Sequence, residues 1–216
     1  MGHGAVNTPP LDRTGLSAIV FDLDGTLYQD ERLGEEVHQS ACRYVAFLKR
    51  IGQQEACDVL HEARSCSKDT GGTLSRAVVA LGGNLRELHR RFNEEVHPET
   101  VLTPDPRVQE LLGRLALRFD LHLYTNNNQA LSSRIMARIG VTGCFKMVFT
   151  IEDSWRPKPD RAVLEGILAS IGKKPAETLF VGDRYQVDLQ LPEALGCQIL
   201  ETRTIEELLT LAQLVD

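Results

Sequence analysis

The 216-residue chain has no long apolar run and no excess of positive charge, and each absence excludes a class of protein. No stretch approaches the roughly 20 apolar residues that a membrane-spanning helix needs. With 24 Lys and Arg against 30 Asp and Glu, the formal net charge is -6. A mildly acidic chain offers no electrostatic footprint for a nucleic acid polymer or an anionic membrane, so we expect neither as a partner. An anionic substrate must then be held by locally gathered cations or by a metal ion.

The beginning of the chain lacks the apolar core of a secretory signal, because it is polar and rich in Gly and Pro. Val6 stands where a myristoylation signal has Ser or Thr. We therefore interpret residues 1–14 as a flexible tail.

The cysteine pattern lacks any CxxC pair. The five cysteines are widely scattered, at Cys42, Cys57, Cys66, Cys144 and Cys197. Their odd number and wide spacing argue against a zinc site and against a disulfide framework. They favour a reducing, cytoplasmic location. We expect all five to be small, buried apolar side chains.

Alternating strand and helix patterns run through most of the chain. Short apolar runs predict strands at residues 18–21, 121–124, 147–150, 178–181 and 198–200. Apolar residues at helical spacing predict helices over 108–115, 131–139, 162–171, 192–196 and 205–214. Repeated strand–helix units imply a parallel sheet with helices on both faces. We therefore predict an α/β fold with a Rossmann-like, three-layer core.

Residues 31–97 follow a different pattern, because no convincing strand occurs there. Helical patterns follow one another over residues 37–51, 56–63, 74–81 and 85–96, and Gly52 is the expected stop of the first. We interpret residues 31–97 as an α-helical cap subdomain inserted after the first strand. The core is then formed by residues 15–30 and 98–216.

Two carboxylates, Asp22 and Asp24, follow directly after the first predicted strand. Asp22, at the tip of a buried strand, would have the fixed geometry that favours a nucleophile. Asp24, in the following turn, could exchange a proton with a leaving oxygen or a water. Gly25 permits a tight turn, and Thr26 can hydrogen-bond within it. For the pair taken alone, a turn that merely closes the strand is the alternative.

Further polar groups follow other predicted strands, and sites in open α/β sheets form outside these carboxyl ends. The Thr125 hydroxyl and the next backbone N–H, that of Asn126, could together hold a phosphoryl oxygen. Lys158, between Pro157 and Pro159, could offset negative charge on a nucleophile and on a phosphate. A helix N-cap cluster and a solvated lysine are the alternative interpretations.

Asp183 and Asp188 add two carboxylates near the end of the fourth predicted strand. Mg²⁺ prefers carboxylate oxygens, water and substrate phosphate. Asp183 is placed to bind it directly, and Asp188, one turn on, could orient a metal-bound water or the lysine. Several carboxylates at one edge repel unless a cation lies among them, so we expect Mg²⁺ as the cofactor. Individually, the two could be a helix cap and an exposed helix residue.

Taken in order, these residues resemble the four motifs of the haloacid dehalogenase-like hydrolase superfamily. Asp22-Leu23-Asp24-Gly25-Thr26 is similar to the first motif, Thr125 to the second, Lys158 to the third, and Gly182-Asp183 with Asp188 to the fourth. The resemblance spans residues 16–202. It implies a Rossmann-like core with a helical cap inserted just after the first motif.

The resemblance also implies a metal and a mechanism. Mg²⁺ would be bound by the Asp22 carboxylate, the Asp24 backbone carbonyl and Asp183. Asp22 would form an aspartyl-phosphate, which is hydrolysed with Asp24 as acid and then as base. Thr125 would bind phosphate, and Lys158 would stabilise Asp22 and the phosphate. Dehalogenases of the superfamily lack an acid at the position of Asp24, so the resemblance implies a phosphatase.

Two positions depart from the superfamily pattern. Arg156-Pro157 precedes Lys158 where glycine is often seen, and Arg184 follows Asp183 where Ser or Asn is common. Neither change removes a catalytic group, but each could alter substrate access.

The expected substrate is a small phosphorylated metabolite, namely a nucleotide, a sugar phosphate or phosphoglycolate. At few positions the chain is similar to the pyrimidine 5′-nucleotidase-like branch, namely Phe21-Asp22-Leu23-Asp24-Gly25-Thr26-Leu27-Tyr28 joined to Tyr124-Thr125-Asn126-Asn127. A cap sets specificity by closing over the core and excluding water. Its polar candidates for substrate contact are His38, Arg43 and Lys68.

Three other functions remain open at this point. A phosphomutase would use the same aspartyl-phosphate and return the phosphate to a sugar. A receiver-type signalling domain would also combine Asp, Thr, Lys and Mg²⁺, but its phosphoacceptor follows a middle strand of the chain, and the helical insertion suits a substrate cap better. A non-catalytic binding protein on the same fold is the third alternative.

Overall fold

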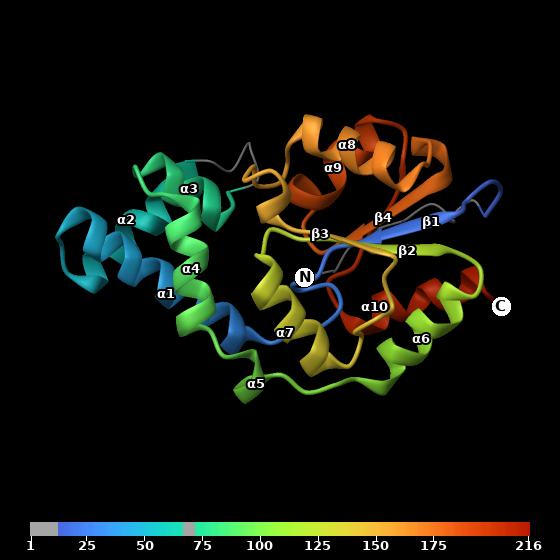
Figure 1. Ribbon diagram of the computed structural model, residues 1–216, viewed down its shortest axis with the longest axis horizontal. Helices are drawn as coiled ribbons and strands as arrows, with labels where there is room; N and C mark the ends of the chain where they lie inside the picture. The colour runs from blue at the N-terminus through green and yellow to red at the C-terminus, as the bar shows by residue number, and fades with distance from the viewer. Residues whose placement is uncertain (1–12, 67–71) are drawn as a thin grey trace, which may run out of the picture.

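The computed structural model of the protein describes residues 13–66 and 72–216, so nearly all of the predicted flexible tail, residues 1–14, lies outside the described residues. One five-stranded parallel sheet forms its centre, in the order β3-β2-β1-β4-β5 (Figure 1). The strands are β1 (Ala18–Phe21), β2 (Asp120–Tyr124), β3 (Met147–Phe149), β4 (Thr178–Gly182) and β5 (Gln198–Glu201). All five predicted strands are therefore confirmed, within one or two residues at their ends.

Helices cover both faces of the sheet. Figure 1 shows α8 and α9 on one face and α6, α7 and α10 on the other. Their bounds, with those of the short helix before them, are α5 (Pro98–Val101), α6 (Pro106–Ala116), α7 (Gln129–Ile139), α8 (Arg161–Ile171), α9 (Gln190–Ala194) and α10 (Ile205–Leu209). Side chains along β1 alternate between the two faces: Val20 packs in the cluster under α8, while Ile19 and Phe21 join the larger core on the other side. This is the predicted three-layer α/β arrangement.

A group of helices lies to one side of the sheet, inserted between β1 and β2 (Figure 1). It consists of α1 (Glu31–Lys49), α2 (Gln53–Cys66), α3 (Leu74–Ala80) and α4 (Leu85–Glu95). Each buries an apolar stripe against the others, with Val45, Leu60, Val78 and Leu88 fully buried. The predicted α/β fold with an inserted helical subdomain is confirmed. None of the helices in the described part of the chain is long and apolar enough to cross a membrane.

Several helix ends differ from the sequence expectation. Gly52 is not the stop of α1, because the helix ends at Lys49 and Arg50 adopts the left-handed conformation, with φ 57. The cap N–H of Arg50 donates to the carbonyl of Ala46, which satisfies a helix-end acceptor that glycine usually serves at less steric cost. The expected terminal helix ends at Leu209 and continues as a 3₁₀ turn, and residues 185–189 form a π-helical turn that the apolar pattern did not predict.

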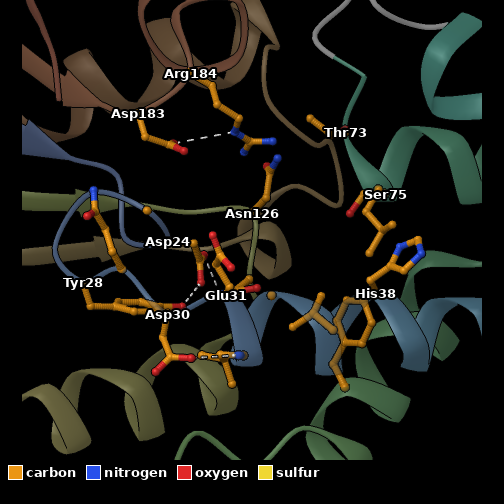
Figure 2. A pocket seen from close by; sticks show the side chains of 18 of the residues that line it. Asp24, Tyr28, Asp30, Glu31, His38, Thr73, Ser75, Asn126, Asp183 and Arg184 are labelled. Atoms are coloured by element: carbon orange, nitrogen blue, oxygen red, sulfur yellow. Dashed lines mark hydrogen bonds and ion pairs between the residues drawn. The ribbon is translucent and has the colours of Figure 1, made fainter. Parts of the chain in front are cut away.

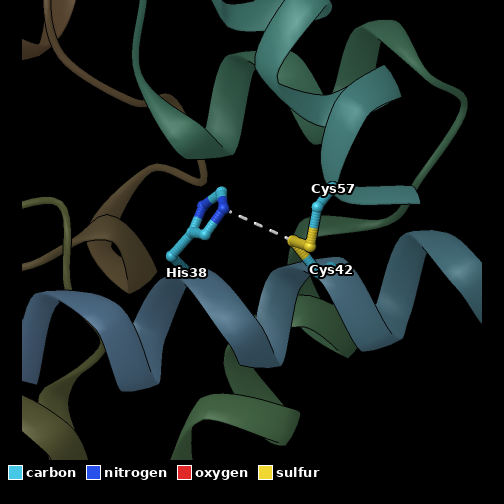
Figure 3. Close-up of side chains that lie close together, drawn as sticks. All are labelled: His38, Cys42 and Cys57. Atoms are coloured by element: carbon cyan, nitrogen blue, oxygen red, sulfur yellow. Dashed lines mark hydrogen bonds between the residues drawn. A yellow bond between two sulfur atoms is a disulfide. The ribbon is translucent and has the colours of Figure 1, made fainter. Parts of the chain in front are cut away.

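Two cysteines depart from the expectation of unlinked, buried thiols. Cys42 on α1 and Cys57 on α2 form a disulfide, and His38 Nε2 lies 3.5 Å from the Cys42 sulfur (Figure 3). The prediction against disulfides is therefore wrong for this pair. Cys66 is exposed, whereas Cys197 is buried as expected. The pairing was not visible in the sequence because it depends on the α1–α2 turn bringing two helix faces together.

Candidate active site

The buried centre of the site is a lysine between two carboxylates. Lys158 Nζ lies 2.7 Å from Asp22 Oδ1 and 2.9 Å from Asp188 Oδ1. All three residues are almost fully buried. Asp22 leaves β1 and Asp188 belongs to the π-helical turn after β4, its neighbour in the sheet, so parallel pairing of β1 and β4 delivers both carboxylates to one edge.

Burial and neighbouring charges both shift the pKa values of Asp22 and Lys158. Burial raises the pKa of the Asp22 carboxyl to about 7, against the opposing effect of the Lys158 ammonium, and the carboxylates of Asp188, Asp24 and Asp183 raise it further. Burial lowers the pKa of Lys158, but Asp188 and Asp22 raise it by more, so the pKa of the ammonium is raised and it stays charged at neutral pH. More negative than positive charge is concentrated here, as expected of a site that takes up a cation.

Two glycines allow the carboxylates to approach the backbone closely. Gly25 has φ +80, and a Cβ on it would lie 2.6 Å from Asp183 Oδ2. A Cβ on Gly182 would lie 2.5 Å from the Cβ of Asp188. Both separations are shorter than real Cβ contacts, so each glycine is required where a carboxylate packs on it. The sequence predicted the tight turn at Gly25 but not the contact across it.

The acidic cluster has the donor set that Mg²⁺ prefers. One oxygen each from Asp22, Asp183 and Asp188 lie within 4.8 Å of one another. Among the described residues, Asp183 Oδ1 is buried with no hydrogen-bond partner, which is costly for a carboxylate unless a cation is close. Burial raises the pKa of Asp183 to about 6, partly opposed by Arg184. An all-oxygen cluster with one unsatisfied carboxylate fits a hard divalent cation.

The Asp24 side chain is held apart from this cluster by three donors. Its Oδ1 accepts from the Tyr28 hydroxyl at 2.5 Å (Figure 2). Its Oδ2 accepts from Asn127 Nδ2 at 2.7 Å and from the Thr125 hydroxyl at 3.5 Å. Neither Tyr28 nor Asn127 was assigned a role from the sequence. Tyr28 stands four residues after Asp24, and the isolated bridge between them places it over the turn. The three donors hold the carboxylate at one side of the site.

The two predicted substrate-binding residues make contacts within the protein. Thr125 is fully buried, and its hydroxyl accepts from the backbone N–H of Asn127 at 3.1 Å. Asn126 Oδ1 accepts from the backbone N–H of Lys158 at 2.8 Å. Asn126 thereby fixes the loop that carries the lysine, a contact between residues 32 positions apart that the sequence did not indicate.

A cavity of about 670 Å³ opens between this edge of the sheet and the helical insertion. Asp24, Asn126 and Asp183 line it on the core side, and Figure 2 shows His38, Thr73 and Ser75 facing them from the helical insertion. Of the expected cap contacts, His38 lines the cavity. Arg43 instead pairs with Glu95 at 2.7 Å, and Lys68 lies outside the described residues. Lining residues that the sequence did not single out include Arg64, Ser75 and His89.

Two arginines of the inserted helices contact the loop that carries Lys158. Arg76 of α3 donates to the backbone carbonyls of Pro157, Lys158 and Pro159. Arg86 of α4 lies over the ring of Trp155, 4.4 Å from its centroid. The insertion is thus joined to the core at the loop that carries Lys158.

The protein is therefore an α/β protein of the parallel-sheet class, with a helical insertion and a buried Asp–Lys–Asp site at the carboxyl edge of its sheet. Residues 19–201 match the family model of the haloacid dehalogenase-like hydrolases, so the chain belongs to that family. The resemblance inferred from the motifs is confirmed at the level of the family.

Relatives of known name span most of the chain. The pyrophosphatase PpaX of Bacillus velezensis is 29% identical over 79% of this chain and 76% of its own. The phosphoglycolate phosphatase of Salmonella typhimurium is 28% identical over 84% of this chain and 79% of its own. Among solved structures, a HAD phosphatase from Thermococcus onnurineus superposes with a TM-score of 0.61, covering 91% of this chain and 98% of its own at 18% identity. The last likeness supports the fold alone.

Proposed function

We propose that the protein is a Mg²⁺-dependent phosphatase that cleaves a small phosphomonoester through an aspartyl-phosphate on Asp22. The observation that carries the proposal is the contact of Lys158 Nζ with Asp22 Oδ1 at 2.7 Å, beside an acidic cluster with an unsatisfied oxygen on Asp183. The named relatives, a pyrophosphatase and a phosphoglycolate phosphatase, act on phosphorylated compounds and support the same reaction class.

Each proposed catalytic residue has a distinct role. An Asp22 oxygen attacks phosphorus while Asp24 gives a proton to the leaving oxygen. Asp24 then takes a proton from the water that hydrolyses the aspartyl-phosphate. Lys158 offsets charge on Asp22 and on the transferred group, and the Thr125 hydroxyl with the Asn126 N–H holds a phosphoryl oxygen.

The proposed metal ligands are Asp22, the backbone carbonyl of Asp24, and Asp183. When bound, Mg²⁺ would supply positive charge that stabilises the attacked phosphate. Asp188 supports the site through its 2.9 Å contact with Lys158, the lysine-orienting role expected from the sequence.

We also propose a division of the chain into a catalytic core and a cap. Residues 15–30 and 98–216 form the catalytic core, and residues 31–97 act as the cap whose closure shields the cavity from water. We place the enzyme in the cytoplasm, although the Cys42–Cys57 disulfide is more typical of an oxidising compartment. Nucleotides, sugar phosphates and phosphoglycolate are the candidate substrates.

Phosphate release from p-nitrophenyl phosphate tests the mechanism. We expect Asp22→Asn to abolish release, because the amide is a poor nucleophile, and we expect EDTA to abolish it in the unmodified enzyme. Asp58→Asn, the same change at an exposed position on α2, is the matched control and should keep full activity. Turnover by Asp22→Asn, or turnover that persists in EDTA, would contradict the proposed mechanism.

A further inference from the structure

The cavity beside the acidic cluster is lined by arginines that the proposed mechanism does not use. They are Arg64 from α2, Arg184 directly after Asp183, and Arg203 after β5. Arg203 is ion-paired with Glu201 at 2.6 Å. Lys158 already serves the transferred phosphate in the proposed mechanism, so Arg64 and Arg184 are the lining arginines left for the rest of the substrate.

The Arg184 guanidinium lies beside two carboxylates but does not hydrogen-bond to them. Its Nε lies 3.6 Å from Asp183 Oδ1 and 3.9 Å from Asp188 Oδ2, both longer than a hydrogen bond. Within residues 13–66 and 72–216, its side chain donates no hydrogen bond. Figure 2 shows it extending from beside Asp183 toward Asn126 in the cavity. Its planar array of N–H donors is therefore available to a ligand.

Arg64 approaches the same cavity from the cap. Its Nε donates to the carbonyl of Gly72 at 3.2 Å, and in the described part of the chain no carboxylate lies within ion-pair distance of it. Arg64 and Arg184 line the same cavity. Burial lowers the pKa of Arg64, and the positive charge of Arg184 lowers it further, so the two cations repel each other. Binding an anion between them removes that repulsion.

Carboxylates on the same cavity wall are engaged elsewhere. Asp30 pairs with Arg32 at 2.6 Å, and Asp24 accepts from Tyr28 and Asn127. Asp183 belongs to the proposed metal cluster, and Glu31 is exposed to solvent. Arg184 lies within ion-pair distance of Asp183 and Asp188, but its N–H donors are not used by them. Arg64 has no carboxylate within that distance in the described part of the chain, so its positive charge is left for a ligand.

We infer that Arg64 and Arg184 form a subsite for a second anionic group on the leaving portion of the substrate, either a carboxylate or another phosphate. A guanidinium matches both groups with two parallel hydrogen bonds. This inference rests on the proposed phosphatase function and narrows its substrate class to small phosphomonoesters with a second negative end. Because one arginine is on the cap and the other on the core, the bound anion also draws the cap onto the core.

Three two-carbon substrates test the subsite in the Mg²⁺-loaded enzyme. Phosphoglycolate carries a carboxylate, ethylene glycol bisphosphate carries a second phosphate, and 2-hydroxyethyl phosphate carries no second charge. We expect kcat/KM for at least one of the two charged substrates to exceed that for the uncharged one by about 10- to 100-fold, the worth of a charge-assisted hydrogen bond. The preferred charged substrate identifies the group that the subsite binds.

Variants then assign the preference to the arginines. In Arg64→Gln and in Arg184→Gln, the ratio of charged to uncharged kcat/KM should fall at least tenfold, mainly through KM, and Arg64→Lys should recover part of it. Arg138→Gln, at an exposed arginine on α7, should keep the ratio. Equal kcat/KM for all three substrates, or a ratio unchanged in both glutamine variants, would overturn the subsite while leaving the phosphatase proposal intact. Release of phosphate from p-nitrophenyl phosphate but from neither charged substrate would also overturn the subsite, and release from none of these compounds would overturn both proposals.

Discussion

Lys158 offsets part of the negative charge of the site. Its ammonium contacts Asp22 and Asp188, and it also lies 4.5 Å from the centroid of the Tyr124 ring. A buried cation between two carboxylates is costly to leave unpaired, because removing one partner exposes the full desolvation penalty of the others. The lysine is thus held in one position, where the proposed attacking group and the transferred phosphate would meet.

His89 is a buried titratable residue whose side chain, unlike that of Lys158, has no polar partner among the described residues. It is 2% exposed, and among the described residues neither ring nitrogen has a hydrogen-bond partner. Its ring packs edge-on against Phe92 and Trp155, at centroid distances of 5.2 Å and 6.0 Å. Burial lowers the pKa of His89 to about 4, so the imidazole is neutral in the folded protein.

The lowered pKa of His89 predicts acid destabilisation. Between pH 6.5 and 4 the unfolded chain protonates this histidine and the folded protein does not, so the free energy of unfolding falls as the pH falls through this range. The loss attributable to His89 should reach about 3 kcal/mol. Urea unfolding of the protein and of His89→Leu at pH 7 and pH 4 measures it. A pH dependence that is the same in both proteins would refute the assignment.

At the scale of elements, the loop over residues 155–160 connects the inserted helices to the candidate active site. Asn126 holds it from the core, through the backbone N–H of Lys158, and Arg76 holds it from α3 through three carbonyls. Helices α3 and α4 therefore contact the loop of the proposed catalytic lysine, and a movement of these helices would displace Lys158.

Arg76 is predicted to be a positioning residue. Arg76→Ala removes all three donors to the loop, and a displacement of Lys158 by about 1 Å is enough to slow the reaction severely. We expect kcat for p-nitrophenyl phosphate to fall about tenfold or more with a smaller change in KM, and faster amide hydrogen exchange over residues 155–160. Arg76→Lys should restore part of kcat.

The control for this prediction is Arg90→Ala on the neighbouring helix α4. Arg90 pairs with Glu87 on an exposed helix face, at 2.8 Å, and makes no contact with the loop. It should keep both kcat and the exchange rate. If Arg76→Ala retained full kcat while exchange in the loop rose, the loop contact would be structural only.

At the scale of the whole molecule, folding concentrates negative charge at one edge of the sheet. Asp22, Asp183 and Asp188 come from segments up to 166 positions apart and meet within 4.8 Å. Only one buried lysine lies among them in the described structure. The folded state therefore gains a candidate cation-binding site that the unfolded chain lacks, and an ion bound there should stabilise it.

Mg²⁺ is accordingly predicted to raise the melting temperature. At a concentration about 100-fold above its dissociation constant, the ion should add about 2.7 kcal/mol to the free energy of unfolding. For a chain of this size that corresponds to roughly 5–10 °C. Asp183→Asn should lose most of the shift, whereas Asp58→Asn should keep it, and differential scanning calorimetry with Mg²⁺ or EDTA compares them. An equal shift in both variants would argue against this cluster as the metal site.

Local patterns along the chain were enough to determine the strands, the α/β class, the helical insertion and the acidic and lysine side chains that meet at the sheet edge. They were enough because apolar periodicity reflects burial, and because parallel strands bring their carboxyl ends together. Helix ends were less predictable. Arg50, not a glycine, closes α1, because its backbone N–H donates to the carbonyl of Ala46.

Only the tertiary structure decided which side chains touch. The hydrogen bonds of Asn126 to the lysine loop and of Asn127 to Asp24, the disulfide of Cys42 with Cys57, and the shared cavity of Arg64 and Arg184 all join separate elements. Periodicity reports whether a residue is buried, but it does not report its partner, because the partner depends on how whole helices and strands pack. The sequence by itself determined the family of chemistry, and the packing of cap on core decided what the cavity presents to a substrate.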